Sequence, residues 1–103
     1  MWAQLISARL KPGKDSDLQQ LIDQLSSLEK PGSGLMRSTA MRDQKDPSRV
    51  HFLVVFESED AARAREQDAG RQEALVPVRQ TMSEIFEGPP EFTDLTVVHE
   101  QLG

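Results

Sequence analysis

Apolar residues gather in four short stretches of the chain, and each stretch indicates a β-strand. The clearest is Val50 to Phe56, where β-branched and aromatic residues follow one another. Weaker strand patterns cover residues 2–10 and 34–42, and a last one runs from Phe92 to His99. Turns rich in proline, glycine and charged residues separate these stretches, so we expect four short strands.

Between the strands, apolar residues recur at the spacing of amphipathic helices. The first helical stripe consists of Leu18, Leu21, Ile22, Leu25 and Leu28, and a later one of Leu75, Val78, Met82 and Ile85. Ser16 and Gln19 fit a capping box at the first helix start. Ser58 is expected to cap a helix over residues 59–68, and Gly70 to break it.

The predicted order of elements is therefore βαββαβ. With right-handed crossovers, both helical regions fall on one face of an antiparallel four-stranded sheet. This is the α+β, ferredoxin-like arrangement, with an expected strand order of 4-1-3-2. We expect residues 1–103 to form a single domain, because chains below roughly 150 residues seldom divide.

The third strand is apolar on both of its faces. Alternation places Phe52 and Phe56 on one face and Leu53 and Val55 on the other. Two helical regions can cover only one face of the sheet, which would leave the second as an exposed apolar patch. The pattern therefore predicts a homodimer in which two sheets pack face to face.

Composition excludes several classes of protein. The 103 residues carry a formal net charge of -5, which argues against nucleic-acid binding because that needs a basic face. There is no cysteine, so disulfides and cysteine-ligated metals are excluded. The longest apolar run, residues 52–56, is far shorter than the ~20 residues that span a bilayer. We expect no membrane association and a cytoplasmic location.

Three segments resemble one known family. They are residues 9–14 (RLKPGK), 42–47 (RDQKDP) and 55–62 (VFESEDAA). Together they are similar to the antibiotic-biosynthesis-monooxygenase family of dimeric α/β barrels. The resemblance implies a ferredoxin-like dimer and a function among that family's activities, which include cofactor-free oxygenation of polycyclic aromatics, quinol oxidation and haem degradation.

The residues that match the haem-degrading branch of that family differ in chemistry. That branch uses an asparagine, a tryptophan and a histidine, whereas the matching positions here hold Ala8, Phe56 and Leu75. Haem iron would therefore lack an axial ligand. The polyketide-oxidising branch uses asparagine and tyrosine, and this chain contains neither residue. We expect no cofactor and no metal ion, and the pattern identifies no catalytic residue.

The candidate substrate-binding residues lie on the helix-facing side of the predicted sheet. Trp2, Phe52 and Phe56 would form an apolar wall, with Trp2 opposite Phe56 across neighbouring strands. Gln4 and Arg79 are the candidate polar anchors. They suit a cofactor-independent monooxygenase of a planar apolar substrate, such as a quinol or a polyketide. The alternatives are plain core packing of the aromatic residues, or a non-catalytic ligand-binding barrel that has lost the family's polar residues.

The remaining ionisable residues carry weaker signals. Alternation places His51 on the predicted dimer face and His99 near the end of the last strand. The two interpretations are a base in a cleft, since histidine titrates near neutrality, or a hydrogen-bonded His51 within the interface and a surface His99. Arg63, Arg65 and Arg71 alternate with acidic residues, which is typical of a solvated helix.

Overall fold

The sheet has four antiparallel strands in the order β2-β3-β1-β4, which confirms the order expected from the sequence. The computed structural model describes all residues from 1 to 103. Its strands are β1 (Trp2–Arg9), β2 (Leu35–Arg42), β3 (Arg49–Phe56) and β4 (Glu91–Thr96). The central pair, β1 and β3, is in register over its full length, from Trp2 opposite Phe56 to Arg9 opposite Arg49.

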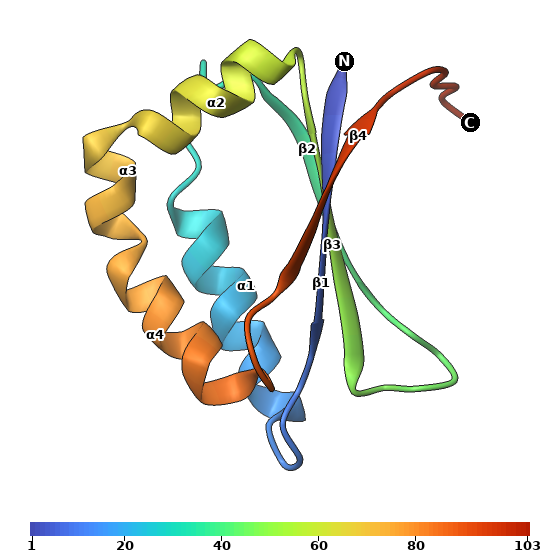
Figure 1. Ribbon diagram of the computed structural model, residues 1–103, viewed down its shortest axis with the longest axis vertical. Helices are drawn as coiled ribbons and strands as arrows, with labels where there is room; N and C mark the ends of the chain where they lie inside the picture. Colours follow the sequence, from blue (N-terminus) through green and yellow to red (C-terminus); the bar gives the residue numbers. More distant parts are fainter.

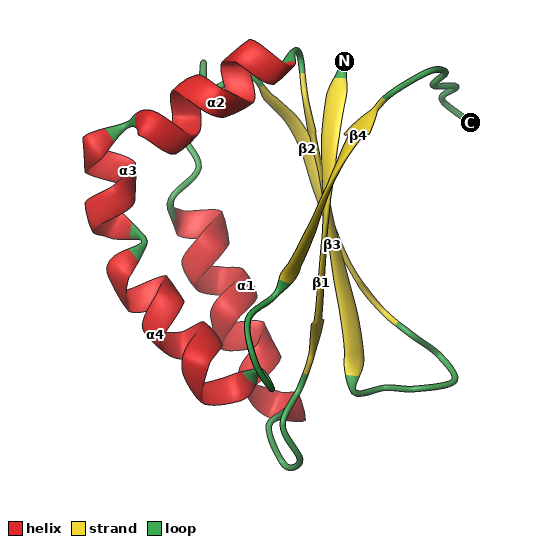
Figure 2. Ribbon diagram, in the orientation of Figure 1, coloured by secondary structure: helices red, strands yellow, loops and turns green.

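All helices lie on one face of this sheet, as the ferredoxin-like prediction requires (Figures 1 and 2). A short 3₁₀ turn, η1 (Asp15–Asp17), leads into α1 (Leu18–Ser27). The second helical region consists of three helices, which are α2 (Glu59–Gln67), α3 (Ala69–Ala74) and α4 (Val76–Ile85). Figure 1 shows these three helices curving around α1. None of the helices combines the length and apolar character needed to cross a membrane.

The start of α1 differs from the predicted capping box. Ser16 lies inside η1, and the residue that precedes the helix is Asp17, whose side chain makes no capping hydrogen bond. The turn supplies a backbone hydrogen bond instead, from the amide of Asp17 to the carbonyl of Lys14 at 3.1 Å. The capping box was wrong because this turn occupies the position that Ser16 would need.

The predicted break at Gly70 is also wrong, and the chain bends at Asp68 instead. Asp68 has an extended backbone, with ψ of 116°, and its carboxylate accepts a hydrogen bond from the amide of Gly70 at 3.1 Å. Gly70 therefore lies in the first turn of α3, capped by Asp68. The predicted cap of α2 is confirmed, since the hydroxyl of Ser58 accepts from the amide of Ala61 at 3.1 Å.

Strand β4 ends at Thr96, three residues before the predicted end at His99. Thr96 pairs with Trp2, the first residue of β1, so residues beyond it have no further strand to pair with. Residues 97–103, the C-terminal segment, lie on the side of the sheet away from the helices (Figure 1). There Glu100 forms an ion pair with Arg37 of β2, with 2.6 Å between carboxylate and guanidinium.

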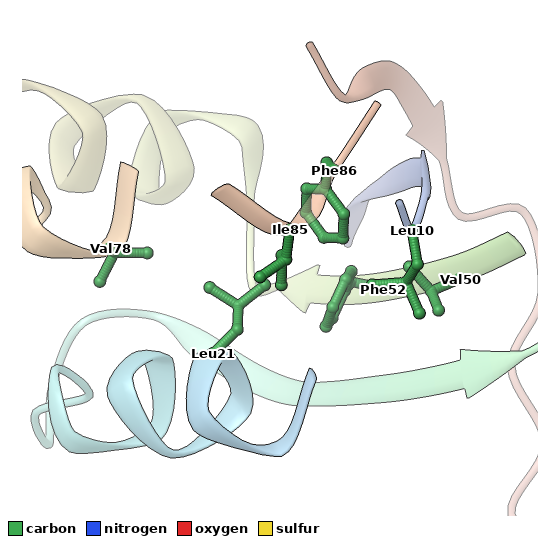
Figure 3. Close-up of a cluster of buried hydrophobic side chains, with 7 residues drawn as sticks. All are labelled: Leu10, Leu21, Val50, Phe52, Val78, Ile85 and Phe86. Carbon is green, nitrogen blue, oxygen red and sulfur yellow. The ribbon is translucent and has the colours of Figure 1, made fainter. Parts of the chain in front are cut away.

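The apolar core is divided into two clusters. The larger one packs α1 and α4 against the sheet and consists of Leu10, Leu21, Val50, Phe52, Val78, Ile85 and Phe86. Figure 3 shows the side chains of Leu21 and Ile85 pointing toward one another beside Phe52. The smaller cluster packs α2 against the far end of the sheet and consists of Trp2, Phe56 and Ala62. The predicted helix-facing set of β3 is confirmed by these two clusters.

Candidate functional site

A cavity of about 410 Å³ is bordered by both core clusters. Trp2, Phe56 and Ala62 line it from the smaller cluster, and Phe52 and Val78 are among those that line it from the larger one. Hydrophobic residues make up 13 of its 22 lining positions. A larger groove of about 510 Å³ lies beside it, but only four of that groove's 16 lining residues are hydrophobic. The cavity is therefore the better site for an apolar ligand.

The five residues that the sequence marks as candidates for substrate binding all line this one cavity: Trp2, Gln4, Phe52, Phe56 and Arg79. The predicted pairing of Trp2 with Phe56 is confirmed, with ring centroids 6.1 Å apart and planes inclined at 49°. Trp2, Phe52 and Phe56 are 7 %, 7 % and 3 % exposed, yet they border open space. Their packing thus forms a wall and leaves the interior between them unfilled.

One of the two side-chain N–H donors of Gln4 is already engaged. Its side-chain nitrogen donates to Oδ1 of Asp94, on the neighbouring strand β4, at 3.0 Å. Since an ionised carboxylate only accepts, this bond fixes which end of the amide is nitrogen. The second N–H and the amide oxygen remain, so Gln4 can donate one hydrogen bond to a ligand and accept another from a ligand hydroxyl, but the adjacent Asp94 carboxylate opposes an anion there.

Asp94 is held from two sides. Besides Gln4, Arg63 of α2 donates to its Oδ2 at 2.8 Å. These hydrogen bonds stabilise the charged carboxylate and lower the pKa of Asp94 below its ordinary value. The guanidinium of Arg63 also lies 4.9 Å from the centroid of the Trp2 ring, a cation–π contact. The network fixes the outer side of the cavity wall formed by Trp2.

Arg79 lies at the exposed rim of the cavity. Its guanidinium donates a hydrogen bond to the side-chain oxygen of Gln72, at 2.5 Å. It also lines a smaller pocket next to Pro89 and Pro90. The structure therefore brings Arg79 to the cavity from the solvent side, while the three aromatic residues form its interior wall.

Two arginines that the sequence pattern assigns to a solvated helix in fact line the cavity. The side chains of Arg65 and Arg71 are each 14 % exposed, so the solvated-helix interpretation is wrong for both. Arg65 pairs with Glu29 and lies over the Phe56 ring, 5.1 Å from its centroid. The interpretation suits Arg63, which is more exposed and pairs with acidic residues on its own helix.

Arg71 and Glu29 are incompletely paired. The guanidinium of Arg71 lies 3.7 Å from Oε1 of Glu29, the oxygen that Arg65 already binds. This separation exceeds hydrogen-bond distance. The second oxygen of Glu29 is buried without a hydrogen-bond partner. Burial lowers the pKa of Arg71, and repulsion from Arg65 lowers it further.

The two histidines lie away from the cavity. His51 faces the opposite side of the sheet, where its Nδ1 is 2.8 Å from the hydroxyl of Ser7 within the same chain. His99 is exposed in the C-terminal segment. No group of three or more histidine, aspartate or glutamate side chains is arranged to hold a metal ion.

Comparison with known families and structures gives a consistent result. Residues 1–75 match the model of the antibiotic biosynthesis monooxygenase family. The comparison with curated proteins gives no match.

Among solved structures, a protein from Nitrosomonas europaea that is provisionally named an antibiotic biosynthesis monooxygenase is 18% identical, with a TM-score of 0.75. The match covers 96% of this chain and 100% of that protein. A protein from Bordetella bronchiseptica with the same provisional name is 24% identical, with a TM-score of 0.74 and coverage of 95% of this chain and 97% of that one. The TM-scores show that these proteins share the fold of this chain.

Proposed function

Because the chain belongs to the antibiotic biosynthesis monooxygenase family, we propose that it is a monooxygenase that oxidises a planar, mostly apolar substrate of the quinol or polyketide type without a bound cofactor. One observation supports this proposal above the others. The cavity of about 410 Å³ is walled by Trp2, Phe52 and Phe56, which offer flat apolar surfaces to a ring system. Its volume falls within the range of roughly 300–1,000 Å³ that is usual for ligand pockets.

The proposed reaction is illustrated by an anthrone. Loss of a proton from the ring CH₂ gives a delocalised anion, which passes one electron to O₂. The two radicals join in a C–O bond, and loss of water from the resulting hydroperoxide leaves a ketone, so that CH₂ and O₂ become C=O and H₂O. The protein has to align the ring, exclude bulk water and stabilise the anion.

A second candidate function is ligand binding without catalysis. It is favoured by one specific observation, which is that one N–H donor of Gln4 is bound to the carboxylate of Asp94, whose negative charge opposes a substrate anion beside Gln4. The cavity also contains no histidine to act as a base. A barrel that kept the apolar wall but lost the family's polar residues would bind the same ring compounds and leave them unchanged.

Oxygen uptake and binding together separate the two candidates. We would supply a panel of anthrones and hydroquinones, follow O₂ with an electrode, and follow binding by quenching of Trp2, the only tryptophan. Uptake together with quenching supports the monooxygenase, whereas quenching without uptake supports the binding protein. Absence of both would refute each of them.

A variant that fills the cavity shows whether the ligand sits there. Leu75 lines the cavity, so Leu75→Trp should abolish binding and uptake. The matched control is Val76→Trp at the next position, which is 59% exposed and does not line the cavity. Equal activity of both variants would show that the cavity is not the site.

We further propose that the chain acts as a homodimer joined through the open face of its sheet. This face carries the half-buried Leu5 and Leu53, and the exposed Met41 and Leu95 border it. On the same face Ala3 and Val55 are already buried within the single chain, at 4 % and 3 % exposed, so the apolar surface left for a partner is that of Leu5, Leu53, Met41 and Leu95. Light scattering of Leu53→Glu should give the monomer mass, against a dimer for the unchanged protein. A monomer in both cases would refute the dimer.

A further inference from the structure

The end of the cavity next to α3 carries a positive charge that the chain itself only partly neutralises. Arg71 is 14 % exposed, and its nearest carboxylate oxygen lies 3.7 Å away, beyond hydrogen-bond distance. That oxygen is already bound by Arg65. A nearly buried guanidinium is strongly stabilised by a bound anion, because the desolvated charge and its N–H donors are otherwise left unpaired.

The residues that line the cavity carry a net positive charge, although the protein as a whole is acidic. The ionisable residues that line it are three arginines and two glutamates, a net charge of +1, whereas the whole chain carries -5. Each glutamate is engaged by an arginine, Glu29 by Arg65 and Glu66 by Arg63. Glu29 is shared by Arg65 and Arg71, so these three side chains together carry a net charge of +1, although the second oxygen of Glu29 has no hydrogen-bond partner.

The side chains of Arg65 and Arg71 lie next to the aromatic wall, and this position indicates where the acidic group of a ligand would bind. Arg65 lies over the Phe56 ring, 5.1 Å from its centroid, and shares the carboxylate of Glu29 with Arg71. Glu29, Arg65 and Arg71 also line the neighbouring outer groove. Glu29, Arg65 and Arg71 thus border both the cavity and the groove. The acidic group of a ligand would reach Arg71 from the apolar cavity or from solvent.

We propose that Arg71, assisted by Arg65, binds an anionic oxygen group of the ligand, so that the cavity takes a planar aromatic compound carrying a carboxylate or an ionised phenol. This inference rests on the proposed function, since it assumes that the cavity holds the ligand. The guanidinium presents a planar fork of N–H donors, which matches the two oxygens of a carboxylate. In a phenolate, the same charge lowers the energy of the anion that reacts with O₂.

The test compares two ligands that differ only in charge. Binding of anthraquinone-2-carboxylate and of its neutral carboxamide is measured by isothermal titration calorimetry at pH 7 and low salt. The unchanged protein should prefer the carboxylate by about tenfold or more, as expected for a charge-assisted hydrogen bond to a largely buried arginine. Arg71→Gln should lose this preference while keeping its affinity for the carboxamide.

Two further variants serve as controls. Arg71→Lys keeps the charge without the fork and should retain part of the preference, which covers the case in which Arg71→Gln fails to fold. Arg9→Gln removes an arginine from an exposed ion pair with Asp46 outside the cavity, and should leave the preference intact.

The outcomes distinguish failure of the anion site from failure of the proposed function of the cavity. Equal affinity of the unchanged protein for both ligands would overturn the anion site and leave the cavity function standing. Binding of neither ligand would overturn both. A preference that survives Arg71→Gln would also overturn the assignment, because the charge would then be read by another group.

Discussion

Gly34 allows an informative test of how closely the start of β2 packs against α2. Its φ of +82° lies in the left-handed region, and a Cβ added there would stand 2.7 Å from the Cβ of Ala61 in α2. Ordinary carbon contacts begin at 3.4 Å. The same residue accepts a hydrogen bond from the amide of Glu57 at 2.9 Å, so its backbone cannot move freely away. Gly34→Ala should therefore be strongly destabilising.

The magnitude has two parts. A left-handed conformation costs a residue with a side chain about 1–2 kcal/mol. The forced contact with Ala61 adds about 1–3 kcal/mol, as other overpacked positions do. We expect Gly34→Ala to lower the free energy of unfolding by about 2–5 kcal/mol, a large part of the roughly 5–15 kcal/mol typical of a domain.

Gly32 provides a matched control for this prediction. It has nearly the same φ, +83°, but an added Cβ would meet nothing within 4 Å. Gly32→Ala should therefore cost only the conformational part, about 1–2 kcal/mol. Both variants are measured by urea unfolding, with the fluorescence of Trp2 as the signal. Ala61→Gly added to Gly34→Ala should recover part of the loss. Equal losses for the two alanine variants would refute the proposed contact.

Two further predictions concern aspartates. Asp68→Ala should lower the free energy of unfolding by about 1 kcal/mol through loss of the cap on Gly70, whereas Asp68→Asn should keep most of it, as urea unfolding can show. Hydrogen bonds lower the pKa of Asp43, Asp46 and Asp94, so their stabilising effect is present above the unfolded value of about 4 and is lost as the pH falls through the folded values. The urea midpoint should drop between pH 5 and pH 3, and the drop should be smaller in Asp46→Asn; a midpoint that rises on acidification would contradict the signs of these shifts.

The strands and the aromatic wall could be predicted from the sequence because their signals are local. Alternation along β3 fixes which side chains face the helices, and antiparallel pairing then sets Trp2 against Phe56. The same information does not reveal that the space between these rings stays open. That depends on how far α2 and α4 stand from the sheet, which is a property of the whole packing.

The polar part of the site was harder to predict, and the reason differs from residue to residue. Arg65 follows the buried Ala62 by three positions, so helical spacing placed it on the inner face, but its charge argued for solvent. Arg71 lies beyond the break at Asp68, where the helical phase restarts. The hydrogen bond between Gln4 and Asp94 joins residues 90 positions apart, and it follows from the register of β1 with β4, which no local pattern sets.

The bend at Asp68 has a consequence for the size of the cavity. A single straight helix over residues 59–85 would measure about 40 Å, longer than the 37 Å that is the longest extent of the whole molecule. The chain instead forms an arch with two joints, one at Asp68 and one at Leu75, and the cavity is the hollow beneath it. The span of such an arch is set by backbone angles at its joints. A change at a joint can therefore resize the hollow for a larger or smaller ligand while every residue of its aromatic wall stays the same.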